Sequence, residues 1–147
     1  MQIAIGSDHR GLELKARVTK LVTDAGHQIK DFGAYTDARV DYPNIAEAVG
    51  KAVVSGTYDK GILICGTGIG MCIAANKVKG IRAALALTEL MACRARQHND
   101  ANILCLGAEN DDSQLTQMVN AFLTCQFEGG RHQSRLDKIT DIEKKYC

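Results

Sequence analysis

The chain has 147 residues and a mass of 15.9 kDa, the size of one ordinary domain, and we expect a single domain over residues 1–147. Its hydrophobic share of 46% and its mean hydropathy of −0.12 exclude a disordered or fibrous chain. Eighteen basic residues against seventeen acidic ones leave a net charge of +1, so no broad basic field is available for nucleic acid or an anionic membrane surface.

Short apolar runs alternate with longer stretches in which apolar residues recur every three or four positions, which is typical of an α/β protein. We predict five strands and six helices that alternate from the first strand, with two helices at the end. In chain order they span residues 2–6, 11–25, 27–32, 44–55, 59–65, 70–78, 81–86, 88–98, 102–106, 112–125 and 134–146. Gly26, Gly56 and Gly80 each follow a predicted helix, where a residue of positive φ ends a helix at little cost.

The amino terminus and the cysteines predict a cellular compartment. Asp8, His9 and Arg10 follow Met1 too soon for a secretory signal, and no run approaches the ~18 apolar residues of a membrane span. We therefore expect a cytoplasmic protein. No cysteine pair has C-x-x-C spacing, so we predict reduced thiols and no metal site. The cysteines expected to serve as small buried hydrophobic residues are Cys72, Cys93, Cys105 and Cys125.

Two loops follow predicted strands, at the edge of the sheet where open parallel sheets bind ligands. The first is Gly6-Ser7-Asp8-His9-Arg10-Gly11, and the second is Cys65-Gly66-Thr67-Gly68-Ile69-Gly70 at the start of a helix. Glycine at alternate positions lets backbone N–H groups converge beside a helix start, which suits a phosphate or an oxyanion. We expect the second loop to bind negative charge.

Three known loop types do not fit this sequence. A dinucleotide fingerprint beginning at Gly66 needs glycine where Met71 stands, and it normally follows the first strand. A Walker loop needs Lys and then Ser or Thr after Gly70, but Met71 and Cys72 follow. A thiol phosphatase with Cys65 as nucleophile needs an arginine at position 71.

Each polar residue near these loops has both a functional and a structural interpretation. Cys65 is placed to act as a nucleophile or a proton-transfer base, and also to pack as a buried cysteine. His98 suits proton transfer but also complements a helix dipole. Arg131 and Arg135 are spaced to hold one phosphate or to lie in solvent at a helix start.

Five segments together resemble the ribose-5-phosphate isomerase type B family, which includes allose-6-phosphate and galactose-6-phosphate isomerases. They are IAIGSDHRG at 3–11, DYPNIA at 41–46, GILICGTGIGMCIAANKVKGIRAA at 61–84, RQHNDANILCLG at 96–107 and EGGRHQSRL at 128–136. The resemblance implies an aldose–ketose isomerase without metal or cofactor. It also implies an α/β/α three-layer sandwich, Rossmann-like, with a five-stranded parallel sheet in the order 2-1-3-5-4, and homodimers that can pair into tetramers.

The resemblance also implies a role for each matching residue. Cys65 corresponds to the base that moves a proton between C1 and C2 of the sugar. His98 corresponds to the group that opens the furanose ring, with Thr67 assisting. The remaining residues correspond to the substrate-binding set: Gly66, Gly68, Ile69 and Gly70 around the enediolate oxygen, Asp8 and Asn99 at the sugar, and His9, Arg131 and Arg135 at the phosphate.

Several alternatives remain open at this point. Allose 6-phosphate and galactose 6-phosphate differ from ribose 5-phosphate mainly in length, and a regulator that binds a sugar phosphate without turnover would keep the same pocket. Cys65 ends a strand whereas His98 precedes one, so we expect them at opposite edges of the sheet and the site shared between two subunits. The alternative is that the turn at 99–101 folds back over its own sheet.

Overall fold

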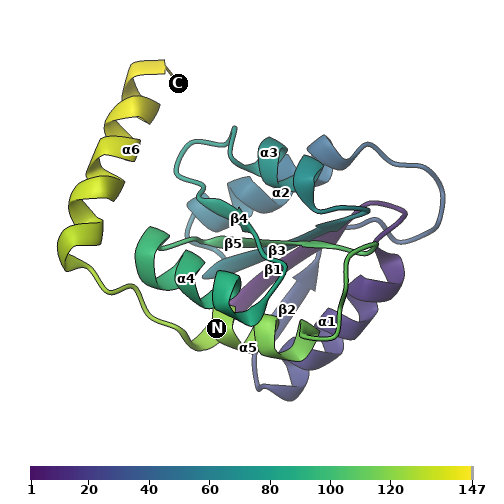
Figure 1. Ribbon diagram of the computed structural model, residues 1–147. Coiled ribbons are helices and arrows are strands. Elements are labelled where there is room, and N and C mark those ends of the chain that lie inside the picture. The colour runs from purple at the N-terminus through teal and green to yellow at the C-terminus, as the bar shows by residue number, and fades with distance from the viewer. Residues whose placement is uncertain (147) are drawn as a thin grey trace.

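The computed structural model describes residues 1–146, in which five strands alternate with helices (Figure 1). The strands are β1 (Gln2–Ser7), β2 (Gln28–Asp31), β3 (Lys60–Cys65), β4 (Ala83–Leu85) and β5 (Ile103–Gly107). The helices are α1 (Leu12–Asp24), α2 (Tyr42–Val54), α3 (Ile69–Ala75), α4 (Glu89–Asn99), α5 (Leu115–Thr124), the 3-10 turn η1 (Gly130–His132) and α6 (Gln133–Tyr146). No helix among these residues is long and apolar enough to cross a membrane.

The strands form one parallel sheet in the order β2-β1-β3-β5-β4, as predicted. Ser7 pairs with Ile64, and Cys65 pairs with Gly107, so β1, β3 and β5 end at the same level. We call this side the carboxyl edge and the opposite side, where the strands begin, the amino edge. The loops that follow these three strands consequently meet at the carboxyl edge.

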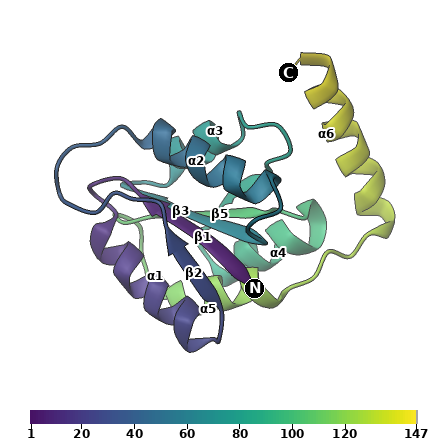
Figure 2. The same ribbon diagram turned by 180° about the vertical axis from the view of Figure 1, so that it is seen from behind.

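Helices cover both faces of the sheet, which confirms the three-layer sandwich (Figure 2). Alternate residues of β3 point to opposite faces, since side chains along a strand have a period of two. Ile62 and Ile64 pack with residues of α1, α4 and α5, whereas Leu63 and Cys65 pack with residues of α2 and α3. The sheet therefore lies between two apolar cores.

One helix ends earlier than its sequence pattern predicts. The pattern extends to residue 78, but α3 ends at Ala75. The Asn76 side chain accepts a hydrogen bond from Ala83 N and donates one to Ala83 O, both at 2.9 Å. These two hydrogen bonds hold Asn76 against Ala83, the first residue of β4. The helix therefore ends because of a contact with a residue seven positions farther along the chain.

The prediction of reduced thiols is wrong for two cysteines. Cys93 in α4 and Cys125 after α5 form a disulfide, with Cα atoms 5.5 Å apart. The two helices pack side by side, which brings together residues separated by 32 positions. Among residues 1–146, Cys65 and Cys105 are buried free thiols and Cys72 is a half-buried one. Cys147 lies outside the described residues.

The last helix projects from the body of the molecule, on the amino-edge side of the sheet (Figures 1 and 2). Only Leu136 of α6 is buried, while Ile139 and Ile142 are 46% and 59% exposed. Both isoleucines line a pocket of about 420 Å³ together with residues of β4 and the end of α4. The helix thus presents an apolar stripe beside the amino edge.

Candidate active site

The loop after β1 buries a carboxylate at the carboxyl edge. Asp8 is 6% exposed, and its Oδ1 accepts a hydrogen bond from Arg10 N at 2.9 Å. Its own backbone N donates to Ile64 O, which anchors the loop on β3. A Cβ atom at Gly11 would lie 2.7 Å from the Ile64 side chain, so only glycine lets α1 begin this close to β3. Asp8 is thereby held close to the end of β3.

The loop after β3 surrounds the sulfur of Cys65. Gly68 N donates a hydrogen bond to Cys65 Sγ at 3.2 Å, and the cysteine is 6% exposed. Gly68 has a φ of +80°, and a Cβ atom there would lie 2.6 Å from Leu85. Thr67 Oγ1 accepts from Ile69 N at 3.3 Å, and the side chain of Thr67 lies on the exposed side of the loop. The turn required of Gly68 therefore aims an N–H group at the sulfur.

The loop after β5 supports this arrangement from the next strand. Ala108 N donates to Cys65 O, and Glu109 N donates to Gly66 O at 2.8 Å. Asn110 Nδ2 donates to Thr67 O at 3.2 Å. We call residues 65–70 the cysteine loop. Three consecutive carbonyl groups of this loop thus accept hydrogen bonds from the loop after β5.

The stretch at 33–43, which is irregular until α2 begins at Tyr42, approaches the same edge. Val40 N lies 3.5 Å from His9 Nδ1 and donates to it. At the other end of the stretch, a Cβ atom at Gly70 would lie 2.8 Å from the ring of Tyr42. Residues 33–43 also line much of a pocket of about 520 Å³. His9 and the cysteine loop therefore lie on the same open side of the molecule.

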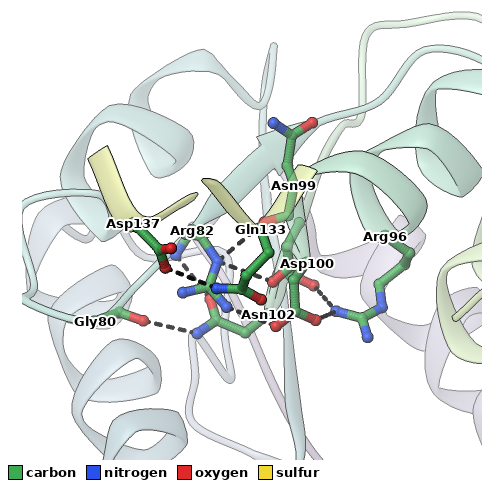
Figure 3. A network of polar contacts seen from close by, with 9 residues as sticks. Gly80, Arg82, Arg96, Asn99, Asp100, Asn102, Gln133 and Asp137 are labelled. Atoms are coloured by element: carbon green, nitrogen blue, oxygen red, sulfur yellow. Dashed lines mark hydrogen bonds and ion pairs between the residues drawn. The ribbon is translucent and has the colours of Figure 1, made fainter. Parts of the chain in front are cut away.

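The end of α4 lies at the amino edge, held by an ion-pair network (Figure 3). Asp100, with a φ of +43°, accepts from Arg96 at 2.7 Å and from Arg82 at 2.9 Å. Arg82 Nε also donates to Asn99 O at 3.0 Å. In Figure 3 the side chain of Asn99 points away from this network, which leaves its amide free for other contacts.

His98 lies in a cluster with residues that the sequence did not single out. Its ring stacks on the ring of His132, with centroids 4.2 Å apart and planes inclined by 12°. Glu128 Oε2 lies 3.9 Å from His98 Nε2 and 3.4 Å from His132 Nε2. Arg131 Nε lies 3.5 Å from His132 Nε2, so Arg131 stands on the same side of the molecule as His98. Glu128 and His132 lie within the segment EGGRHQSRL, which was the available signal for them.

The predicted site residues thus form two groups at opposite edges of the sheet. Asn102 O accepts from Gly61 N, so the turn after His98 is level with the start of β3. Cys65 lies four residues farther along that strand, about 13 Å at ~3.3 Å per residue. The carboxyl-edge group contains Asp8, His9, Cys65, Gly66, Thr67, Gly68, Ile69 and Gly70. The amino-edge group contains His98, Asn99 and Arg131, and Arg135 follows in α6.

Two further thiols, Cys72 in α3 and Cys105 in β5, form a hydrogen bond with each other. A hydrogen bond from the Cys105 side chain lowers the pKa of Cys72 from 9.0 to about 6, although partial burial opposes this. The same contact, together with complete burial, raises the pKa of Cys105 well above 9.0. Negative charge on this pair therefore resides on Cys72.

Known proteins resemble this chain over its whole length. A model of the Ribose/Galactose Isomerase family matches residues 3–139. Ribose-5-phosphate isomerase B of Escherichia coli strain K12 is 45% identical over 145 residues, 98% of this chain and 97% of the relative. The solved structure of ribose-5-phosphate isomerase B from Clostridium thermocellum is 47% identical with a TM-score of 0.98, and each chain is covered to 100%. That of Mycoplasma genitalium, with bound ribulose-5-phosphate, is 48% identical with a TM-score of 0.92, over 98% of this chain and 97% of that chain.

Proposed function

This chain belongs to the ribose/galactose isomerase family, and from that premise we propose that it is a ribose-5-phosphate isomerase. It interconverts ribose 5-phosphate and ribulose 5-phosphate by ring opening and proton transfer through an enediolate. The observation that carries this assignment is the ribulose-5-phosphate in a relative that matches 98% of this chain at 48% identity. The two groups of side chains at the sheet edges supply the chemistry that the reaction needs.

The proton transfer is assigned to the carboxyl edge. Cys65, as the thiolate, takes the proton from C2 of the open-chain aldose and returns it to C1, because a neutral thiol is a poor base. The charge that develops on the sugar oxygen meets the backbone N–H groups of the loop from Gly66 to Gly70. Asp8, buried beside this loop, accepts hydrogen bonds from sugar hydroxyl groups.

Ring opening and phosphate binding are assigned mainly to the amino edge. His98 transfers the proton that opens the furanose, with Thr67 of the other edge assisting, and Asn99 binds the sugar or the enediolate. The guanidinium groups of Arg131 and Arg135 pair with the phosphate dianion, as this group favours bidentate contacts with oxyanions. His9 completes the phosphate site from the carboxyl edge.

These assignments require two chains in one active site. Along β3, the turn after His98 and Cys65 are separated by about 13 Å, far beyond hydrogen-bond reach within one chain. A two-fold dimer that sets the amino edge of one chain against the carboxyl edge of its partner forms two equivalent sites. The exposed apolar stripe of Ile139 and Ile142 supports such a dimer, because a dimer would cover it. Two such dimers can pair into a tetramer.

The setting follows from the reaction. Pentose phosphate interconversion belongs to carbohydrate metabolism through the pentose phosphate pathway, and we assign the protein to the cytoplasm. A reducing cytoplasm would hold Cys93 and Cys125 as thiols. Cell fractionation with an antibody to the chain tests this assignment, and recovery in a membrane or secreted fraction contradicts it.

The test of the proposed function is turnover by the purified protein with three substrates. We expect kcat/KM to be highest for ribose 5-phosphate and lower for allose 6-phosphate and galactose 6-phosphate. A preference for either hexose phosphate would reassign the substrate within the family. Saturable binding of ribose 5-phosphate without turnover would identify a regulator that lacks catalysis.

A further inference from the structure

Three potential metal ligands meet at the end of α4. His98 is in α4, Glu128 in the segment after α5 and His132 in η1, and their donor atoms all lie within 4.8 Å of one another. Glu128 N donates to Gln97 O at 3.0 Å, so a backbone hydrogen bond holds the carboxylate beside His98. The spacing of these residues in the sequence indicated no such site, because packing of the segment after α5 against α4 creates it.

The separation of His132 and Glu128 suits a small tetrahedral cation, whereas His98 lies slightly too far away. Zinc bonds of about 2.0–2.2 Å to nitrogen and oxygen imply ligand atoms about 3.3–3.6 Å apart. His132 Nε2 and Glu128 Oε2 are separated by 3.4 Å, and His98 Nε2 and Glu128 Oε2 by 3.9 Å. The stacked rings cannot both direct a lone pair at one ion, so His98 must turn. Its side chain is 31% exposed, which leaves room for that rotation.

The charges around the cluster both favour and oppose a cation. The Glu128 carboxylate supplies the negative charge that attracts a cation, and the two imidazole rings complete a set of ligands that zinc accepts. Against the cation stands Arg94, whose Nη1 lies 3.3 Å from His98 Nε2 and 4.0 Å from Glu128 Oε1. Arg131 also stands against it, because its Nε donates to His132 Nε2 at 3.5 Å and must also turn away. Because Arg94 is half exposed, an incoming ion can displace it.

We propose that His98, Glu128 and His132 form an inhibitory site for Zn²⁺ or a similar divalent cation such as Co²⁺. The bound ion takes the ring nitrogen of His98 as a ligand and replaces the proton there, and water fills the fourth position. The inhibition rests on the proposed function, in which His98 must exchange a proton with the sugar. Zinc binding would therefore stop ring opening while leaving the chain folded.

The site is tested first by a measurement that needs no turnover. Co²⁺ is titrated into the whole protein, and the visible bands of tetrahedral Co²⁺ are recorded and then displaced by Zn²⁺. Glu128→Gln and His132→Asn should each weaken Co²⁺ binding at least tenfold, and Arg94→Gln should strengthen it because a competing cation is gone. Glu47→Gln is the matched control, since Glu47 is also exposed and paired with a cation, Lys51.

The inhibition is tested on the same variants. Zn²⁺ should inhibit the parent protein, and the rate of each variant with Zn²⁺ is compared with its own rate without Zn²⁺. The inhibition constant should rise in Glu128→Gln and His132→Asn, which bind Co²⁺ more weakly, and fall in Arg94→Gln, which binds it more tightly. Unchanged Co²⁺ bands in Glu128→Gln and His132→Asn, or strong thiolate-to-cobalt bands, overturn the site. Tight Co²⁺ binding without inhibition overturns the inhibitory role. A protein that shows the bands but no isomerase activity contradicts the proposed function and leaves the metal site standing.

The strengthened binding in Arg94→Gln also guards against misfolded variants. A damaged fold weakens a metal site, so a gain in affinity cannot come from damage. Equal Co²⁺ affinity in Arg94→Gln and the parent protein contradicts the displacement of Arg94 on which the geometry depends.

Discussion

The two edges of the sheet hold their side chains by different means. At the carboxyl edge, backbone hydrogen bonds to Cys65 O, Gly66 O and Cys65 Sγ position the cysteine loop. At the amino edge, ion pairs from Arg82 and Arg96 to Asp100 hold the turn after His98. A backbone bond survives most changes of side chain, whereas an ion pair depends on two particular residues. A single substitution in these ion pairs should therefore destabilise the folded structure of the amino edge, even where the effect on activity is greater at the carboxyl edge.

The largest effect is expected at the carboxyl edge. Cys65→Ala should lower kcat by at least ~10²-fold, as loss of a general base does, and leave the fold and the binding of ribose 5-phosphate largely intact. Steady-state kinetics, calorimetric binding and circular dichroism measure the three properties. Retention of more than a tenth of the rate would show that Cys65 is not the base. Alkylation of Cys65 should also inactivate the enzyme, and substrate should protect it.

Mixing variants tests whether the edges meet across a dimer. Cys65→Ala and His98→Ala proteins should each be nearly inactive, but a co-refolded mixture should regain about a quarter of wild-type activity. Half of randomly paired dimers are hybrids, and each hybrid has one site with both natural residues. If hybrids are demonstrated by mass spectrometry and activity does not return, Cys65 and His98 act within one chain.

Substitution of a phosphate ligand at the amino edge should change KM, whereas substitution of Cys65 at the carboxyl edge should change kcat. Arg135→Ala should raise KM for ribose 5-phosphate by roughly tenfold or more, the loss expected for a charge-assisted hydrogen bond, and change kcat little. Unphosphorylated ribose should be affected hardly at all. Arg17→Ala, which breaks an exposed ion pair with Asp112, serves as the control. Equal losses for ribose and ribose 5-phosphate would assign Arg135 another role.

The reliance of the amino edge on ion pairs predicts a loss of stability. Asp100→Ala leaves Arg96, which is 7% exposed, without its carboxylate, and should lower the free energy of unfolding by about 2 kcal/mol. Asp24→Ala breaks an exposed pair with Lys20 and should cost less than about 0.5 kcal/mol. Urea unfolding compares them, and equal values would contradict the contrast between the edges.

A smaller effect concerns the thiol of Cys72. Its pKa of about 6 predicts alkylation that rises around pH 6 and levels off above it, whereas Cys105 should react only after unfolding. The unfolded chain protonates this thiol up to about 9.0, so its contribution to stability grows from pH 6 towards 9 and is lost as the pH falls. Peptide mass spectrometry after alkylation checks the order, and labelling of Cys105 before Cys72 would refute it.

The alternation of strands and helices was predictable because it depends on local patterns, whereas the strand order came from the resemblance to known isomerases. Short apolar runs between glycines marked the strands, and Gly26, Gly56 and Gly80 have φ values of +77° to +87°, as their positions after helices implied. The resemblance to known isomerases supplied the site residues, and the register of β1, β3 and β5 brings Asp8 close to the end of β3.

What the sequence could not predict depends on contacts between distant segments. The end of α3 is decided by Asn76 and Ala83 across a turn. The Cys93–Cys125 disulfide needs α4 and α5 to lie side by side. The stacking of His98 on His132 needs the chain after α5 to return to α4. No periodicity or spacing along the chain records these approaches.

The disulfide between α4 and α5 has a thermodynamic consequence for the whole chain. It closes a covalent loop over a separation of 32 residues, and β5 lies inside that loop. Loop closure restricts the unfolded chain, and for this length the chain-entropy relation gives about 3.5–4 kcal/mol. Domains are stable by only ~5–15 kcal/mol in total. The folded population therefore depends on the thiol–disulfide balance around the protein, and the segment that reduction releases is the one that carries His98.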